Sequence, residues 1–206
     1  MPLYQTDGTT ARNVESAVVW RQGVVSTGTA YVDLQYSDAR TAGYSFFKLV
    51  LGGVRITSKE LALWGLKSSG TPETAGYYGG VFTHGEGTGY QYLSQQASSN
   101  PFTNHGFFPI SATKVGGEAS IYLGYYTIYI SDPINTAITG IAGAYPNLWW
   151  QGTHRLNGSL ASNTQGGGVN NRFSAHYGVR FGASDGSTAM DRCTYVLTAY
   201  KEGGQY

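Results

Sequence analysis

The sequence has few charged residues and a single cysteine. Asp, Glu, Lys and Arg make up 12% of the 206 residues, about half the share of an ordinary soluble domain. Thirteen basic and twelve acidic side chains give a net charge of +1, which leaves no basic surface for binding nucleic acid through its phosphates. Cys193 alone excludes an intrachain disulfide and any Cys-x-x-Cys site, and we expect it to be buried and unreactive.

Long apolar runs are also missing. No stretch approaches the roughly 18 apolar residues of a membrane helix, and the first residues carry no basic segment followed by an apolar one. We therefore expect neither a signal peptide nor membrane insertion.

Signatures of catalysis and metal binding are scarce. The sequence contains no G-x-S-x-G, H-E-x-x-H or P-loop motif, and no two of its twelve carboxylates stand out as a glycosidase pair. His84-Gly85-Glu86 has the H-x-E spacing of a cupin metal site, but the next histidine, His105, follows an irregular stretch. The sequence predicts a protein that is not an enzyme and has no cofactor or metal.

Glycine and tyrosine are abundant, with 30 and 17 residues, and alternating apolar positions dominate the chain. This pattern is typical of strands that bury one face. Residues 13–20 are the best helical candidate, and it is weak. The expected strands are residues 29–36, 44–51, 61–64, 120–130, 173–181 (odd positions toward the core) and 193–200, and the expected turns include 52–53, 69–72, 166–168 and 185–186.

Many short strands separated by turns predict an all-β, antiparallel jelly-roll sandwich. We expect residues 17–206 to form this single domain and residues 1–16 to form a short N-terminal arm, either frayed or ordered against a neighbouring subunit. Residues 83–113 show little alternation and are expected to form a long excursion from one end of the sandwich, where binding loops usually lie.

Two segments resemble a β domain of phage and prophage tail-fibre and virion proteins. The first runs from the aromatic strand at Phe46 through Gly52-Gly53-Val54-Arg55 to Gly76-Tyr77-Tyr78, and the second runs from Gly178-Val179-Arg180-Phe181 to Lys201. The resemblance brackets residues 44–201. Ala199-Tyr200 and Met190-Asp191-Arg192 depart from the family's pattern. The resemblance implies a jelly-roll virion component that is trimeric in fibres, and it carries no catalytic residues.

Aromatic residues beside polar turns are the candidate binding residues: Trp149, Trp150, Tyr77, Tyr78, Tyr90 and Tyr92. Aromatic rings stack on sugars while amides and hydroxyls bind their hydroxyl groups, but tyrosine is equally common in protein interfaces. The pattern therefore leaves glycan binding and subunit contact both open. Because neighbouring residues of a strand point to opposite faces, only one of Trp149 and Trp150 is expected to be exposed.

Together these features predict a virion protein that is assembled as a homo-oligomer, expected to be a trimer, beside other virion proteins. The first hypothesis is a tail-fibre or spike module that recognises a host surface polysaccharide. The alternative is a capsid decoration or head-fibre protein that stabilises the phage head through its N-terminal arm and aromatic interfaces.

Overall fold

The computed structural model describes residues 3–6, 11–14, 17–56, 59–85, 89–94, 106–111, 123–131, 147–157, 160–170 and 177–201. Most of these residues lie in strands. The elements are β1 (Leu3–Thr6), β2 (Ala11–Val14), β3 (Val18–Val25), β4 (Tyr31–Gln35), α1 (Ser37–Thr41), β5 (Tyr44–Arg55), β6 (Leu61–Leu66), β7 (Tyr77–Gly85), β8 (Gly89–Ser94), β9 (Phe108–Pro109), β10 (Gly124–Ser131), β11 (Asn147–Asn157), β12 (Leu160–Asn170), β13 (Gly178–Ala183) and β14 (Arg192–Lys201).

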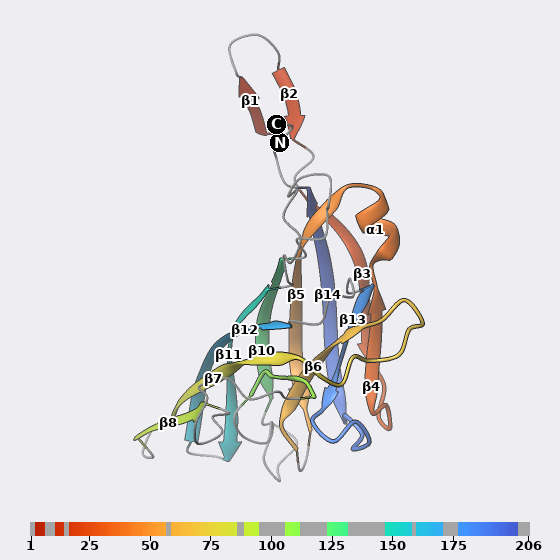
Figure 1. Cartoon of the computed structure of the whole chain (residues 1–206). Helices are drawn as coiled ribbons and strands as arrows, with labels where there is room; N and C mark the ends of the chain where they lie inside the picture. Colours follow the sequence, from red (N-terminus) through yellow and green to blue (C-terminus); the bar gives the residue numbers. More distant parts are fainter. Residues whose placement is uncertain are drawn as a thin grey trace.

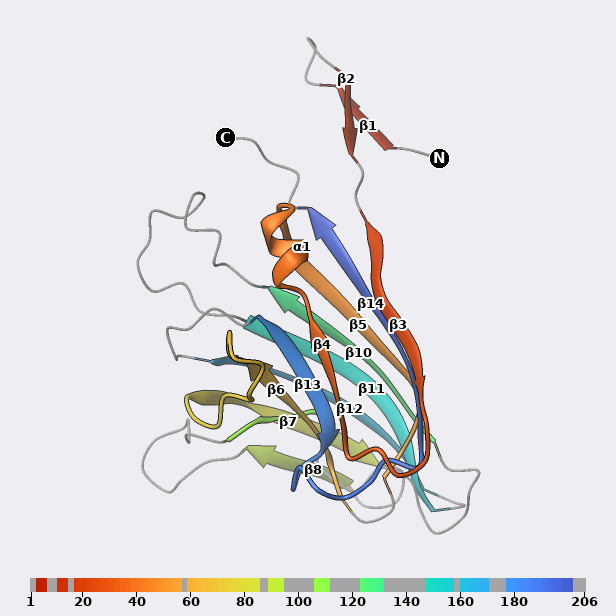
Figure 2. The ribbon, with the colours of Figure 1, turned by 90° about the vertical axis from the view of Figure 1, so that its right-hand side faces the viewer.

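Two antiparallel sheets form a sandwich (Figures 1 and 2). The large sheet has eight strands in the order β3-β14-β5-β10-β11-β12-β7-β8, and the small sheet has four in the order β4-β13-β6-β9. Figure 2 shows β4, β13 and β6 in front of the large sheet. The expectation of an all-β antiparallel sandwich is confirmed.

The core lies between the sheets and follows from strand alternation. Every second residue of β5 and β10 points inward and is buried, while the residues between them are partly or largely exposed. The buried side chains include Phe47, Leu49 and Leu51 on β5, Tyr126, Ile128 and Ile130 on β10, and Leu34, Leu63, Val179 and Phe181 on the small sheet. One face of the large sheet is therefore left facing outward.

The turn predicted at residues 52–53 is wrong, because β5 continues through it to Arg55. Gly53 has a φ of 63°, a backbone conformation that glycine adopts without steric cost. The registers of both neighbouring strands, β10 and β14, shift at this point. The two glycines thus form a β-bulge inside a long strand. The turns at residues 69–72 and 185–186 are confirmed, with glycines at positive φ and turn hydrogen bonds.

Three further predictions are wrong. The described residues among 13–20 are not helical, since Asn13 lies in β2 and Trp20 lies in β3. Residues 166–168 lie inside β12 instead of forming a turn, because pairing with β11 and β7 on both sides supplies the stability that glycine's own propensity lacks. Tyr177 was expected to face the core and is 37% exposed, since β13 begins only at Gly178. The short helix α1 was not predicted.

Residues 83–113 are more regular than expected. They include the end of β7, the strand β8 that pairs with it, and β9 of the small sheet. The predicted excursion is therefore in part a hairpin at the edge of the large sheet. Residues 86–88, 95–105 and 112–113, which include Glu86 and His105, lie outside the described residues.

Residues 3–14 contain a two-stranded sheet, β1 paired with β2, in the segment expected to be an arm. Figure 1 shows this hairpin beyond the end of the sandwich. Its strands join neither of the larger sheets.

Candidate functional site

The outward face of β10, β11 and β12 brings nine residues together in three rows. Strand register places Tyr129 beside Trp149 and Gly167, Thr127 beside Gln151 and Gln165, and Tyr125 beside Thr153 and Asn163. All nine belong to the alternate positions that point away from the core, and none of them is buried. Three neighbouring strands therefore present aromatic rings at two ends and amide and hydroxyl groups between them.

A groove of about 510 Å³ lies over the second and third rows. Its outward-facing lining residues are Val50, Gly52, Tyr125, Thr127, Gln151, Thr153, Asn163 and Gln165. None of its described lining residues is charged. We call this surface the outer groove. Tyr125, 55% exposed, supplies its largest accessible ring.

Trp149 and Trp150 divide as the strand geometry predicts. Trp149 is 48% exposed on the outward face and Trp150 is fully buried. The Trp150 ring lies 6.2 Å from that of Phe108, which meets the Tyr77 ring edge-on at 4.7 Å. Trp150 therefore belongs to the packed layer that supports the groove from below, and only Trp149 is available to a ligand.

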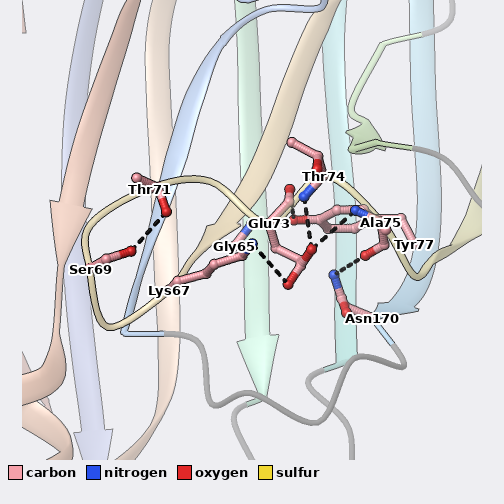
Figure 3. A network of polar contacts seen from close by, with 9 residues as sticks. All are labelled: Gly65, Lys67, Ser69, Thr71, Glu73, Thr74, Ala75, Tyr77 and Asn170. Carbon is pink, nitrogen blue, oxygen red and sulfur yellow. Dashed lines mark hydrogen bonds and ion pairs between the residues drawn. The ribbon is translucent and has the colours of Figure 1, made fainter.

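Tyr77 is a structural residue. It is 1% exposed, and its hydroxyl accepts a hydrogen bond from the Gly65 amide at 2.8 Å and donates one to the Glu73 carbonyl at 2.9 Å. Figure 3 shows these contacts within the connection from β6 to β7, where the Asn170 amide donates to the Ala75 carbonyl at 3.4 Å. The network fixes the passage of the chain from the small sheet to the large one.

A carboxylate completes this network. Glu73 Oε1 accepts hydrogen bonds from the amides of Thr74 and Ala75 at 3.0 and 3.3 Å, and Oε2 lies 3.8 Å from Lys67 Nζ. Its two oxygens are thus engaged in holding the loop (Figure 3).

The remaining tyrosine candidates are placed only by their backbones. Tyr78 lies opposite Val169, while Tyr90 and Tyr92 lie on β8, opposite residues of β7. Their side chains are outside the described residues, as is that of His84. No cluster of three His, Cys, Asp or Glu side chains suited to a metal ion occurs in the described part of the chain.

Two titratable groups on the inward side of the large sheet are held in their neutral forms. His154, on the inward side of β11, stacks on Tyr126 with 6.2 Å between ring centroids, and burial lowers its pKa to about 4. Burial raises the pKa of Cys193 to about 12, which agrees with the expected buried thiol. The Cys193 thiol donates a hydrogen bond to the Thr194 carbonyl, with 3.2 Å between sulfur and oxygen.

Sequence reasoning missed most of the groove. Tyr125, Thr127, Gln151 and Gln165 give no signal of their own, because outward polar residues look alike on any strand. The alternation of residues 147–153 could have revealed β11, and with it the row that leads from Trp149 to Thr153.

Comparison with known proteins gave no match: no family model fits the chain, and neither a curated protein nor a solved structure is similar to it. None of the described helices is long and apolar enough to cross a membrane.

Proposed function

We propose that this chain is a non-enzymatic host-recognition module of a bacteriophage virion, and that its outer groove binds a neutral surface glycan. The observation that carries the proposal is the outer groove. It combines the exposed ring of Tyr125 with uncharged amide and hydroxyl side chains. A sugar offers the matching surfaces, since its C–H faces stack on aromatic rings and its hydroxyls bind amides.

The absence of charge in the described lining supports binding without hydrolysis. Glycoside hydrolysis ordinarily needs two carboxyl groups at the scissile bond, and the lining residues provide none. A neutral surface is also not repelled by an anionic cell envelope.

Strand order supports a jelly roll as the scaffold. With the hairpins β7–β8 and β11–β12 set aside, the sheets reduce to β3-β14-β5-β10 and β4-β13-β6-β9. The chain then passes between the two sheets from β3 to β4, back to β5 and on to β6, as the Greek-key connections of an eight-stranded jelly roll do. On this proposal the hairpin β11–β12 widens one sheet and carries most of the groove.

Capsid decoration is the second candidate, and the edge strand β3 favours it. Val18, Val19 and Val24 are 38%, 54% and 75% exposed, and β3 pairs with a neighbour on one side only. An apolar edge strand of this kind is suited to pairing with another protein chain.

The expected trimer would be tested by the mass in solution, measured by light scattering.

Binding of the labelled protein to intact candidate host cells, with extracted surface polysaccharide as competitor, tests the proposal. Saturable binding that the polysaccharide abolishes is expected, and Tyr125→Ala should weaken it. Tyr31→Ala is the matched control, because Tyr31 is 40% exposed but lies on the small sheet. Absence of cell binding together with tight binding to undecorated capsids would refute glycan recognition and establish decoration.

A further inference from the structure

Trp149 has one covered face and one open face. Its ring stacks on that of Tyr129 with 4.9 Å between centroids and 26° between planes. Tyr129 is its register partner on β10, so the indole face toward β10 is occupied. On the other side, toward β12, the register partner of Trp149 is Gly167, and the partner of Gly167 on β7 is Gly80.

Gly167 does not have to be glycine for the backbone to pair. A Cβ at this position would lie 3.3 Å from the Leu148 carbonyl oxygen, a tight contact that requires the paired backbone to shift by a few tenths of an ångström, and 4.0 Å from Trp149 Cδ1, which is ordinary van der Waals contact. Gly79 is different, because its Cβ would lie 2.5 Å from the Gly167 carbonyl oxygen. The strand can therefore accommodate a side chain at residue 167, and that side chain would stand beside the open indole face.

We infer that Trp149 and Gly167 form a stacking subsite for one sugar ring, next to the outer groove. The inference rests on the proposed function and extends it. The indole supplies the face on which the ring stacks, and glycine keeps the space beside that face free. Trp149 is 48% exposed, so the surface is accessible before any ligand binds.

The subsite and the groove are continuous. Gln151 and Gln165 are the next outward residues along the same two strands, and they pair with each other in register. Thr153 follows Trp149 by four positions, which is about 13 Å along a strand. This length exceeds one sugar ring, so the ligand is an oligosaccharide that lies along β11, with one ring on Trp149 and the others in the groove.

The charge of the surface sets the chemical class of this ligand. The described lining of the groove is uncharged, and the cation Lys48 on β5 has its Nζ 5.8 Å from the Tyr129 ring centroid. Tyr129 separates that ammonium group from the open face of Trp149, since it lies on the strand between them. The stacked ring is therefore a neutral sugar.

The test compares fragments of increasing length from the surface polysaccharide of a cell that the wild-type protein binds. Gly167→Val fills the space with a residue suited to a strand, and Gly167→Ala is a milder second variant. Both should reduce the affinity for long fragments, Gly167→Val by roughly tenfold, or about 1.4 kcal/mol. Neither should change the affinity for fragments too short to reach Trp149.

Two further variants and two further measurements keep the outcome specific. Trp149→Ala should reproduce the loss seen with Gly167→Val, and a long fragment should protect the exposed indole of the wild-type protein from acrylamide quenching. Thr198→Ile, which adds apolar bulk to the same face on β14, is the matched control and should bind as the wild-type protein does. Thermal unfolding of each variant shows that the fold is retained.

Unchanged affinity of Gly167→Val for long fragments, with the wild-type protein binding them, would overturn the subsite and leave the proposed function standing. A wild-type protein that binds neither cells nor fragments of any length would instead overturn the proposed function, and the subsite with it.

Discussion

Tyr77→Phe removes one hydroxyl group from the connection between the two sheets and leaves the ring in place. The wild-type hydroxyl bridges the Gly65 amide of β6 and the Glu73 carbonyl of the β6–β7 loop. The phenylalanine ring can still meet Phe108 edge-on, as the tyrosine does. The substitution therefore isolates the contribution of two hydrogen bonds from that of apolar packing.

The cost follows from the surroundings of each partner. The bond to the Gly65 amide is buried, and a buried donor left without a partner costs about 1–3 kcal/mol. The Glu73 carbonyl is partly buried, so water can replace the lost donor and only the net value of a hydrogen bond, about 0.5–1.5 kcal/mol, is lost. We expect Tyr77→Phe to lower the free energy of unfolding by about 2–4 kcal/mol in total.

Urea unfolding followed by circular dichroism measures this difference, with a fall in Tm of roughly 5–15 °C as the thermal counterpart. Tyr125→Phe is the matched control, because that hydroxyl is on a 55% exposed side chain and should change stability by no more than about 0.5 kcal/mol. Equal urea midpoints for Tyr77→Phe and the wild-type protein would refute the assignment of Tyr77 as the bridge between the sheets.

Three further predictions concern the core and the glycines. Burial keeps His154 neutral in the folded protein, so as the pH falls below 6.5 toward about 4 the unfolded chain takes up a proton before the folded one does. The free energy of unfolding should therefore drop by roughly 3 kcal/mol over that range. A His154→Gln variant whose stability still falls as steeply would contradict this. For Cys193 the sign is opposite, because the unfolded thiol ionises near pH 9 and the folded one near 12, and the resulting alkaline loss of stability should be smaller in Cys193→Ala, as pH-dependent urea unfolding would measure. Gly79→Ala should destabilise the protein by about 1–3 kcal/mol, because the new Cβ would lie 2.5 Å from the Gly167 carbonyl oxygen and 2.7 Å from Gly168 Cα. Equal Tm values for Gly79→Ala and Gly167→Ala would show that the two positions do not differ.

The strands that the sequence predicts are those in which alternation is carried by large side chains. The expected segments 44–51 and 193–200 correspond to the central strands β5 and β14, where Phe47, Leu49 and Leu197 fill the core. The strand β4 was found from its alternation, whereas β6 was predicted from a short apolar run and is buried at every position. Burial of one face leaves a sequence pattern only when inward and outward residues differ in kind.

The strands that were missed have no such contrast. β12 contains three consecutive glycines between Gln165 and Val169, and β7 contains a consecutive pair, Gly79 and Gly80. Glycine is unfavourable in strands taken singly, so a turn was the natural prediction. Pairing on both sides of β12 reverses that preference, and such pairing between distant segments is invisible in a single sequence.

The same difficulty limits prediction of the site. Alternation showed that only one of Trp149 and Trp150 could be exposed, but not which, because the answer depends on which residue of β11 first faces the core. Tyr77 was proposed as a binding residue on its position beside a polar turn. Its hydroxyl instead serves Gly65, a residue of the other sheet, and nothing in the local sequence indicates that contact.

The glycines that hid β12 from the sequence pattern also account for the open face of Trp149. A strand with alternating large side chains would have been recognisable, but its outward residue opposite Trp149 would stand where Gly167 leaves space. Because a Cβ at residue 167 meets only contacts that a slight shift relieves, whereas one at residue 79 meets backbone at 2.5 Å, steric necessity explains glycine at residue 79 and not at residue 167. The exposed indole of Trp149, with one free face, gives a reason for glycine at residue 167 that backbone geometry does not supply. Variants at residue 167 therefore discriminate best between a binding surface and an ordinary solvent-facing sheet.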